Sequence, residues 1–249
     1  MAEIADRAPV ALVVGAGDYI GAAIAKRFAA GGFTLAVGRR KADKLASLVA
    51  EIEAKGGRAH AFALDARSEE NVQEVFASVE RSLGALEVVV FNVGANVSFP
   101  ITETTSRVFR KVWEMACLGG FLTGREAARV MRPRRRGSIF FTGATASMRG
   151  GKGYAAFASA KFGLRALAQS MARELGPENI HVAHLVIDAG VDTAFVRERI
   201  QATGRDPASL PSDSLMNPAS IGEAYWMLHQ QPRDAWTFEL DLRPHREPW

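Results

Sequence analysis

One alanine-rich stretch carries a phenol and an amine at a spacing suited to proton transfer. Tyr154, Phe157 and Lys161 stand at positions i, i+3 and i+7 of a segment without Gly or Pro, which predicts a helix with all three side chains on one face. On that face the phenol could donate a proton, and the ammonium could make it a better donor. The pattern also fits an ordinary amphipathic helix with a surface Lys and two buried aromatic rings, so the surrounding elements must decide.

Short apolar runs alternate with helical patterns along the chain. The expected strands cover 10–14, 33–37, 59–64, 86–91, 138–142, 180–187 and 236–242, and the expected helices cover 22–30, 41–55, 68–83, 107–131, 154–175, 194–201 and 218–228. This alternation predicts one doubly wound α/β domain over residues 1–249, with a parallel sheet of about seven strands, helices on both faces and a ligand crevice at the carboxyl ends of the strands. Segment 194–216 is a candidate substrate lid.

The composition limits the class of protein. The 249 residues are 48% hydrophobic and 23% charged, as expected for a soluble globular protein with a full core. One cysteine, Cys117, excludes an internal disulfide and a cysteine-rich metal site, and it is best read as a small buried hydrophobe. No apolar run approaches the roughly 20 residues that span a bilayer, and residues 1–9 do not have the pattern of a secretory signal. We expect a cytoplasmic protein without a membrane or metal partner.

The formal net charge of +4 would suit an anionic small molecule or a nucleic acid. The basic cluster Arg132–Gly137 lies between an expected helix and an expected strand, where a solvated loop is the ordinary interpretation. No nucleic-acid-binding motif and no interleaved aromatic residues accompany it. We therefore expect a small-molecule substrate and no nucleic-acid partner.

A glycine turn follows the first expected strand. Gly15, Gly17 and Gly21 would let the backbone approach a pyrophosphate at the amino end of the next helix, although an ordinary strand–helix turn has similar residues. After the second strand come Arg39 and Arg40 with no carboxylate beside them. Because a 2′-phosphate calls for arginine and a 2′-hydroxyl for an acid, this favours NADP(H) over NAD(H); a solvated basic loop is the alternative.

These features, in this order and spacing, resemble the short-chain dehydrogenase/reductase family over nearly the whole chain. The resemblance implies a Rossmann fold, NADP(H)-dependent oxidoreductase activity, and a homodimer or homotetramer. It also implies cofactor-binding roles for residues that follow the strands: Gly15, Gly17, Tyr19, Ile20 and Gly21 in the glycine turn, Arg39 and Arg40 after the second strand, Asp65 and Ala66 at the adenine, Asn92 and Gly94 along the crevice, Lys161 at the nicotinamide ribose, and Val191 and Thr193 at the carboxamide.

The sequence departs from the family at the catalytic end. The usual Tyr-x-x-x-Lys pattern, counted back from Lys161, puts Phe157 at the Tyr position, Ala144 at the Ser position and Cys117 at the upstream Asn position. Tyr19 likewise replaces the middle glycine of the turn. Phe cannot donate a proton and Ala cannot hydrogen-bond a carbonyl. Losing a general acid costs about 10²–10⁴ in rate, so a dinucleotide-binding protein with little or no turnover is the alternative to an atypical enzyme.

Tyr154 offers a replacement donor. Its spacing to Lys161 resembles that of the enoyl-thioester reductases, a divergent branch that has Met where Phe157 stands and a differently built glycine region. In conjugate reduction one phenol could stabilise the developing enolate, so the missing Ser would matter less. We therefore predict Tyr154 and Lys161 as the catalytic pair for an apolar carbonyl or enoyl substrate, with the direction of reaction left open.

Other side chains border the expected crevice. The Thr142 and Thr145 hydroxyls flank Ala144 and could replace the missing Ser, although a strand-end Thr more often bonds its own backbone. Asp188 ends the sixth strand and could shift the pKa of a neighbouring group. The apolar substrate is expected from four large side chains in nearby loops: Phe99, Met148, Phe195 and Met216.

Overall fold

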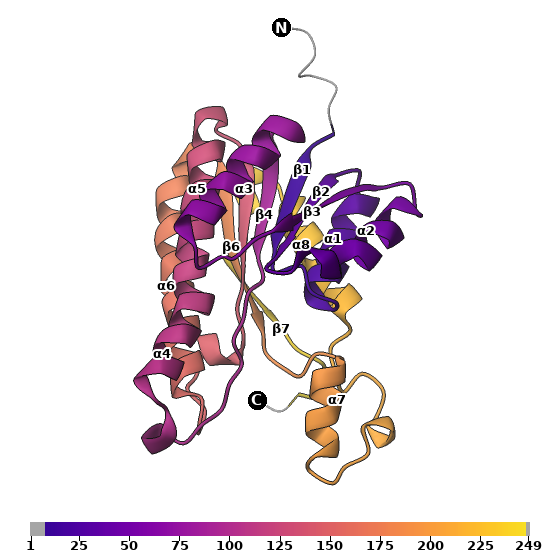
Figure 1. Ribbon diagram of the computed structural model, residues 1–249, viewed down its shortest axis with the longest axis vertical. Helices are drawn as coiled ribbons and strands as arrows, with labels where there is room; N and C mark the ends of the chain where they lie inside the picture. The colour runs from indigo at the N-terminus through magenta and orange to yellow at the C-terminus, as the bar shows by residue number, and fades with distance from the viewer. Residues whose placement is uncertain (1–7, 248–249) are drawn as a thin grey trace, which may run out of the picture.

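Seven short apolar runs form the strands of one parallel sheet in the computed structural model, which describes residues 8–247 (Figure 1). The strands are β1 (Val10–Val14), β2 (Thr34–Arg39), β3 (Arg58–Ala63), β4 (Leu86–Phe91), β5 (Gly137–Thr142), β6 (Ile180–Ile187) and β7 (Glu239–Leu242). Their order is β3-β2-β1-β4-β5-β6-β7, with every neighbouring pair parallel. The order reverses between β1 and β4, where a doubly wound sheet opens a crevice. The predicted Rossmann-like α/β fold is confirmed.

Helices cover both faces of the sheet, as Figure 1 shows. One face carries α1 (Ile20–Ala30), α2 (Ala46–Glu53) and α8 (Pro218–His229), and the other carries α3 (Glu69–Ser82), α5 (Gly119–Met131) and α6 (Ala155–Leu175). Helix α4 (Ser106–Trp113) packs beside α6, and α7 (Ala194–Gln201) stands below the carboxyl edge of the sheet. Within residues 8–247, none of these helices combines the length and the apolar character that crossing a bilayer requires.

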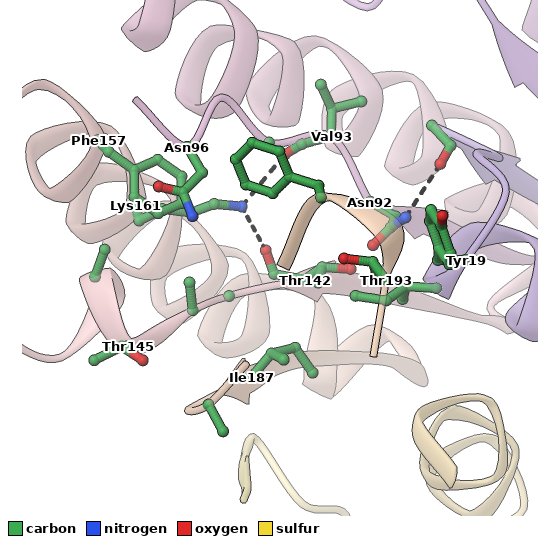
Figure 2. A pocket seen from close by; sticks show the side chains of 18 of the residues that line it. Tyr19, Asn92, Val93, Asn96, Thr142, Thr145, Phe157, Lys161, Ile187 and Thr193 are labelled. Carbon is green, nitrogen blue, oxygen red and sulfur yellow. Dashed lines mark hydrogen bonds between the residues drawn. The ribbon is translucent and has the colours of Figure 1, made fainter. Parts of the chain in front are cut away.

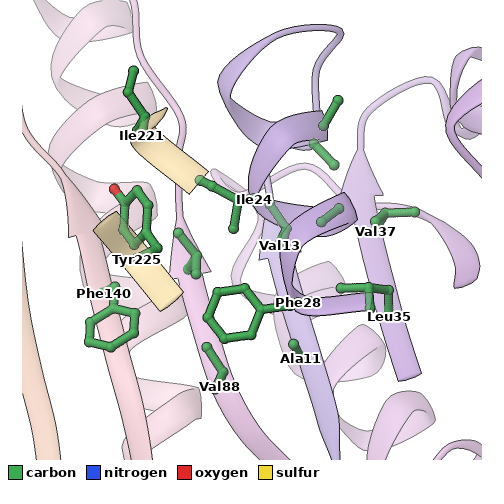
Figure 3. Packing of buried hydrophobic residues seen from close by; sticks show 14 of the residues in the cluster. Ala11, Val13, Ile24, Phe28, Leu35, Val37, Val88, Phe140, Ile221 and Tyr225 are labelled. Carbon is green, nitrogen blue, oxygen red and sulfur yellow. The ribbon is translucent and has the colours of Figure 1, made fainter. Parts of the chain in front are cut away.

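The central strands are mainly apolar because both faces of the sheet are covered there, whereas the edge strands β3 and β7 carry charged residues and are largely unburied. All five residues of β1 are buried, and alternate ones belong to the two opposite core clusters. On the α1 and α8 face, Phe28 and Tyr225 pack over Val13, Val88 and Phe140 (Figure 3). This double burial holds the carboxyl ends of β1, β4, β5 and β6 in fixed positions beside one another.

Three predicted elements differ from the structure. The expected helix over 41–55 begins as a 3₁₀ turn, Ala42–Leu45, and is α-helical only over Ala46–Glu53. The expected helix over 107–131 is interrupted, because residues Glu114–Leu118 form a π-helical turn between α4 and α5. Cys117 lies in this turn and is buried, as predicted. The last strand begins at Glu239 instead of Trp236, because the Trp236 ring stacks on His181 with centroids 4.8 Å apart and lies outside the ladder.

Helices α1 and α8 meet backbone to backbone. A Cβ atom added at Gly222 would stand 2.9 Å from the Ala23 carbonyl oxygen, so only glycine fits there. The helix that follows the glycine turn is therefore fastened to the helix that follows segment 194–216.

Candidate active site

Two cavities adjoin along the carboxyl edge of the sheet. Their volumes are about 730 and 550 Å³, and both are lined by Gly15, Gly17 and the start of the loop after β4 (Asn92, Val93 and Gly94), so they form one crevice. Predicted site residues also line each cavity separately. The larger cavity is lined by Tyr19, Ile20, Gly21, Tyr154, Lys161 and Thr193. The smaller cavity is lined by Arg39, Arg40, Asp65 and Ala66. Val191 lines neither cavity; it is buried and bridges Met216.

The glycine turn is fixed by close backbone contacts. Gly15 has φ +86°, and a Cβ atom there would lie 2.7 Å from the Asn92 carbonyl oxygen; at Gly21 it would lie 2.5 Å from the Gly15 carbonyl oxygen. A Cβ at Gly17 would meet nothing within 4 Å. The Asn92 side chain donates to the Gly15 carbonyl at 3.1 Å, and no side chain caps α1. The turn therefore presents uncapped helix amides beside open space, as an anionic ligand requires.

The smaller cavity is strongly basic. Five cationic side chains and one carboxylate line it: Arg39, Arg40, Lys41, Lys44, Arg67 and Asp65. The Asp65 carboxylate accepts hydrogen bonds from the Arg67 guanidinium at 2.6 and 2.9 Å, and these bonds lower the pKa of Asp65. Arg67 thus neutralises the acid, and of the four other cations Arg39 pairs with Asp18, at 3.4 Å. Arg67, Lys41 and Lys44 were not predicted as site residues, although Lys41 directly follows the arginine pair.

Lys161 is almost completely buried at the floor of the larger cavity. Its Nζ donates to the backbone carbonyls of Thr142, at 2.8 Å, and Val93, at 3.3 Å, which fastens it to the ends of β5 and β4 (Figure 2). The Phe157 ring lies beside it, with its centroid 5.9 Å from Nζ. Burial lowers the pKa of Lys161 to about 8 because the ammonium loses its hydration.

Tyr154 lines the same cavity at the amino-terminal end of α6. Its hydroxyl accepts a hydrogen bond from Arg199 Nη2 on α7 at 2.7 Å. Within residues 8–247 no hydrogen bond joins Tyr154 to Lys161, so the structure brings both into one cavity but gives the phenol a different cationic partner. Arg199 was missed; its position four residues after Phe195 on the expected helix was the available signal.

The hydroxyls around Ala144 have separate environments. Thr142 lines the cavity, and its Oγ1 hydrogen-bonds the buried Tyr225 hydroxyl at 2.7 Å. The expected bond to its own backbone was wrong, because α8 supplies a partner. Thr145 lines the cavity, and its hydroxyl makes no hydrogen bond with any described residue. Asn96, a polar group that the sequence did not single out, lines it too.

Comparison with known proteins identifies the family. The short chain dehydrogenase family matches residues 9–203. The chain belongs to this family. It is therefore an oxidoreductase of the dehydrogenase/reductase type.

Relatives of this short-chain dehydrogenase share most of its length. A crystal structure of a short-chain dehydrogenase from Rhodopseudomonas palustris is 57% identical, with a TM-score of 0.82 over 95% of this chain and 99% of that one. The 3-oxoacyl-[acyl-carrier-protein] reductase MabA of Mycobacterium tuberculosis is 32% identical over 84% of this chain and 81% of that protein. An alcohol dehydrogenase from Thermococcus sibiricus, in complex with 5-hydroxy-NADP, is 28% identical, with a TM-score of 0.83 over 96% and 98% of the two chains.

The outer wall of the larger cavity is only partly as expected. Of the four loop residues predicted to border it, Phe195 lines it; Phe99 and Met148 are exposed elsewhere, and Met216 is buried against Val191. Arg149 also lines it.

Asp188 faces cations at the end of β6 in this short-chain dehydrogenase. Arg149 donates to one of its carboxylate oxygens at 3.4 Å, and Arg243 lies 3.0 Å from the other. The side chain is buried, so Asp188 acts as the anchor of these arginines. Within residues 8–247 no cluster of His, Cys, Asp or Glu is arranged to hold a metal.

Proposed function

We propose that this short-chain dehydrogenase uses NADP(H) and reduces an apolar carbonyl or enoyl compound. The observation that carries the proposal is one continuous crevice with a basic end and a Lys161 end, joined by the glycine turn. The bound nicotinamide supplies the hydride. The excess of cationic side chains at the basic end suits a 2′-phosphate, and the Thermococcus sibiricus relative carries an NADP derivative.

The residues present fit such a cofactor along its whole length. The uncapped amino end of α1, at Tyr19, Ile20 and Gly21, would hold the pyrophosphate. Arg39 and Arg40 would bind the 2′-phosphate. The remaining contacts would come from residues that line the crevice: Asp65 and Ala66 at the adenine, Asn92 and Gly94 beside Gly15 and Gly17, Lys161 at the ribose, and Thr193 at the carboxamide. Val191 lines neither cavity, so its proposed role is limited to holding this segment through its bridge to Met216.

Tyr154 is the proposed proton donor in an atypical catalytic end, where Phe157 and Ala144 replace the usual Tyr and Ser. Its hydroxyl oxygen accepts from Arg199, and a guanidinium has no acceptor, so the phenol's own hydrogen is free for a substrate oxygen. Apolar side chains surround that position, Phe157 and Phe195 among them. Segment 194–216, which carries Phe195 and Arg199, would close over the substrate as a lid.

Turnover tests this proposal. Purified protein should consume NADPH faster than NADH when supplied with a panel of ketones, 3-oxoacyl thioesters and enoyl thioesters. Tyr154→Phe should lower kcat by about 10²–10⁴, the contribution of a general acid. Unchanged turnover in this variant would refute the donor assignment while the enzyme proposal survived.

A second candidate is a dinucleotide-binding protein with little or no turnover. Phe157, Ala144 and the engaged Thr142 hydroxyl favour it, because the positions nearest to Lys161 then offer no acid. NADPH would bind, and no substrate in the panel would consume it. Binding titration and the turnover assay together separate the two.

The assembly and location follow the family resemblance. We propose a homodimer or homotetramer in the cytoplasm, with no nucleic-acid partner. Light scattering on the purified protein would give the mass; a monomer would contradict the first part of this proposal.

A further inference from the structure

Helix α7 is held over the crevice at two points. At its amino end the Ala194 N–H donates to the Tyr19 hydroxyl at 3.0 Å, and five residues later Arg199 donates to the Tyr154 hydroxyl at 2.7 Å. Tyr19 belongs to the glycine turn and Tyr154 to the amino end of α6. One short helix therefore contacts both the proposed phosphate side and the proposed donor side of the site.

The two arginines of α7 have different environments. Arg197 pairs with Asp192 through two hydrogen bonds, at 2.5 and 2.8 Å. Arg199 has no carboxylate partner among the described residues; its guanidinium lies 5.7 Å from the Phe195 ring and donates to Tyr154. Because Phe195 and Tyr154 both line the larger cavity, Arg199 is directed to the site while Arg197 is not.

The contact fixes the phenol for one task. A charge-assisted hydrogen bond is strong and directional, so it holds the Tyr154 oxygen in one place. Since Arg199 can only donate, the phenol's hydrogen must find another acceptor, and no described residue provides one. A substrate oxygen that enters the cavity can take the place of solvent water as that acceptor.

We propose that Arg199 is the positioning residue for Tyr154, so that the proton donor is complete only when α7 is seated on the crevice. This inference rests on the proposed function, in which Tyr154 donates the proton. It adds a coupling that Lys161 does not provide, because Lys161 is bonded to strand carbonyls and does not contact Tyr154.

Kinetics with single variants of Arg199, Arg197 and Tyr154, and with one double variant, test the inference. Arg199→Met should lower kcat by about 10- to 100-fold, as expected for loss of a hydrogen bond from a charged group, with a smaller change in KM. Arg199→Lys should recover part of the loss, and the matched control Arg197→Met should keep kcat. In a protein that already carries Tyr154→Phe, adding Arg199→Met should lower kcat little further. A rise in KM at constant kcat, or full additivity with Tyr154→Phe, would mean that Arg199 only seats the helix, and the inference would be wrong.

Hydrogen exchange separates this inference from the proposed function. Exchange of the 194–201 amides should rise equally in Arg199→Met and Tyr154→Phe, rise no further in the double variant, and stay unchanged in Arg197→Met. Unchanged exchange in Arg199→Met would refute the contact itself, whatever the turnover. If exchange rises as expected but the unaltered protein turns over nothing, the proposed function fails and takes the positioning role with it. If turnover is present and kcat is insensitive to Arg199, the inference alone fails.

Discussion

Burial of the Lys161 amine should make the stability of the protein rise with pH. The amine is enclosed at the cavity floor, where burial lowers its pKa from 10.5 to about 8. Between these two values the unfolded chain holds the proton and the folded chain does not. Unfolding therefore takes up a proton in this range, and raising the pH stabilises the fold. Below pH 8 the amine is charged in both states and the full cost of burying the charge is present.

The size of the effect follows from the difference between the two pKa values. The fall in the pKa of Lys161 from 10.5 to about 8 destabilises the folded protein by roughly 3 kcal/mol at neutral pH. About 2 kcal/mol of this destabilisation should disappear between pH 8 and pH 10. Lys161→Met removes the titration but keeps the approximate volume. It also removes the hydrogen bonds to the Thr142 and Val93 carbonyls, which changes the free energy of unfolding by an amount that is largely constant with pH.

Urea unfolding of the unaltered protein and Lys161→Met at several pH values between 7 and 10 would measure this. The unaltered protein should gain about 2 kcal/mol relative to the variant between pH 8 and pH 10. Lys152→Met, which removes an exposed amine, is the matched control and should show a constant difference. A constant difference for Lys161→Met as well would refute the reasoning, because the buried amine would then titrate as it does in the unfolded chain.

Three further perturbations have distinct expected results. Gly17→Val should change the free energy of unfolding by no more than about 0.5 kcal/mol but abolish NADPH binding, because the new side chain would occupy the open cavity. Gly21→Val should lower the free energy of unfolding by about 1–3 kcal/mol or more, because its side chain meets backbone. Urea unfolding and a binding titration would distinguish the two variants. Tyr225→Phe should lower the free energy of unfolding by about 1–3 kcal/mol, because it leaves the Thr142 hydroxyl buried without its partner. Adding Thr142→Val should recover part of this lost stability in the same unfolding assay. Replacing Arg39 and Arg40 by alanines should weaken the binding of NADPH by about 10- to 100-fold and the binding of NADH far less. Equal losses of affinity for the two dinucleotides in a titration would contradict the 2′-phosphate assignment.

The sheet could be predicted because its pattern is local. Val10–Val14 and Val88–Phe91 are continuous apolar runs, and burial on both faces makes such runs the signature of central parallel strands. Their carboxyl ends meet at one edge, so Asn92 and the glycine turn could be assigned to a common crevice before the structure was known.

The partners of the site residues could not be predicted because they are distant in sequence. Thr142 meets a side chain 83 positions later, and Tyr154 meets one 45 positions later. Periodicity tells which face of α8 is buried, but not which residue lies opposite a given hydroxyl, and α7 buries no residue at all. The π-helical turn at Glu114–Leu118 was hidden for a related reason: one additional residue in a turn leaves the apolar pattern of a long helix almost unchanged.

The loop that contains α7 begins and ends at anchored points. Val191 and Met216 pair in a parallel bridge, the Met216 N–H donates to the Gly190 carbonyl, and α8 directly beyond is locked to α1 at Gly222. Between these anchors α7 reaches both sides of the larger cavity, through Ala194 to Tyr19 and through Arg199 to Tyr154. A change in this segment should therefore alter the glycine turn and the α6 side of the cavity together.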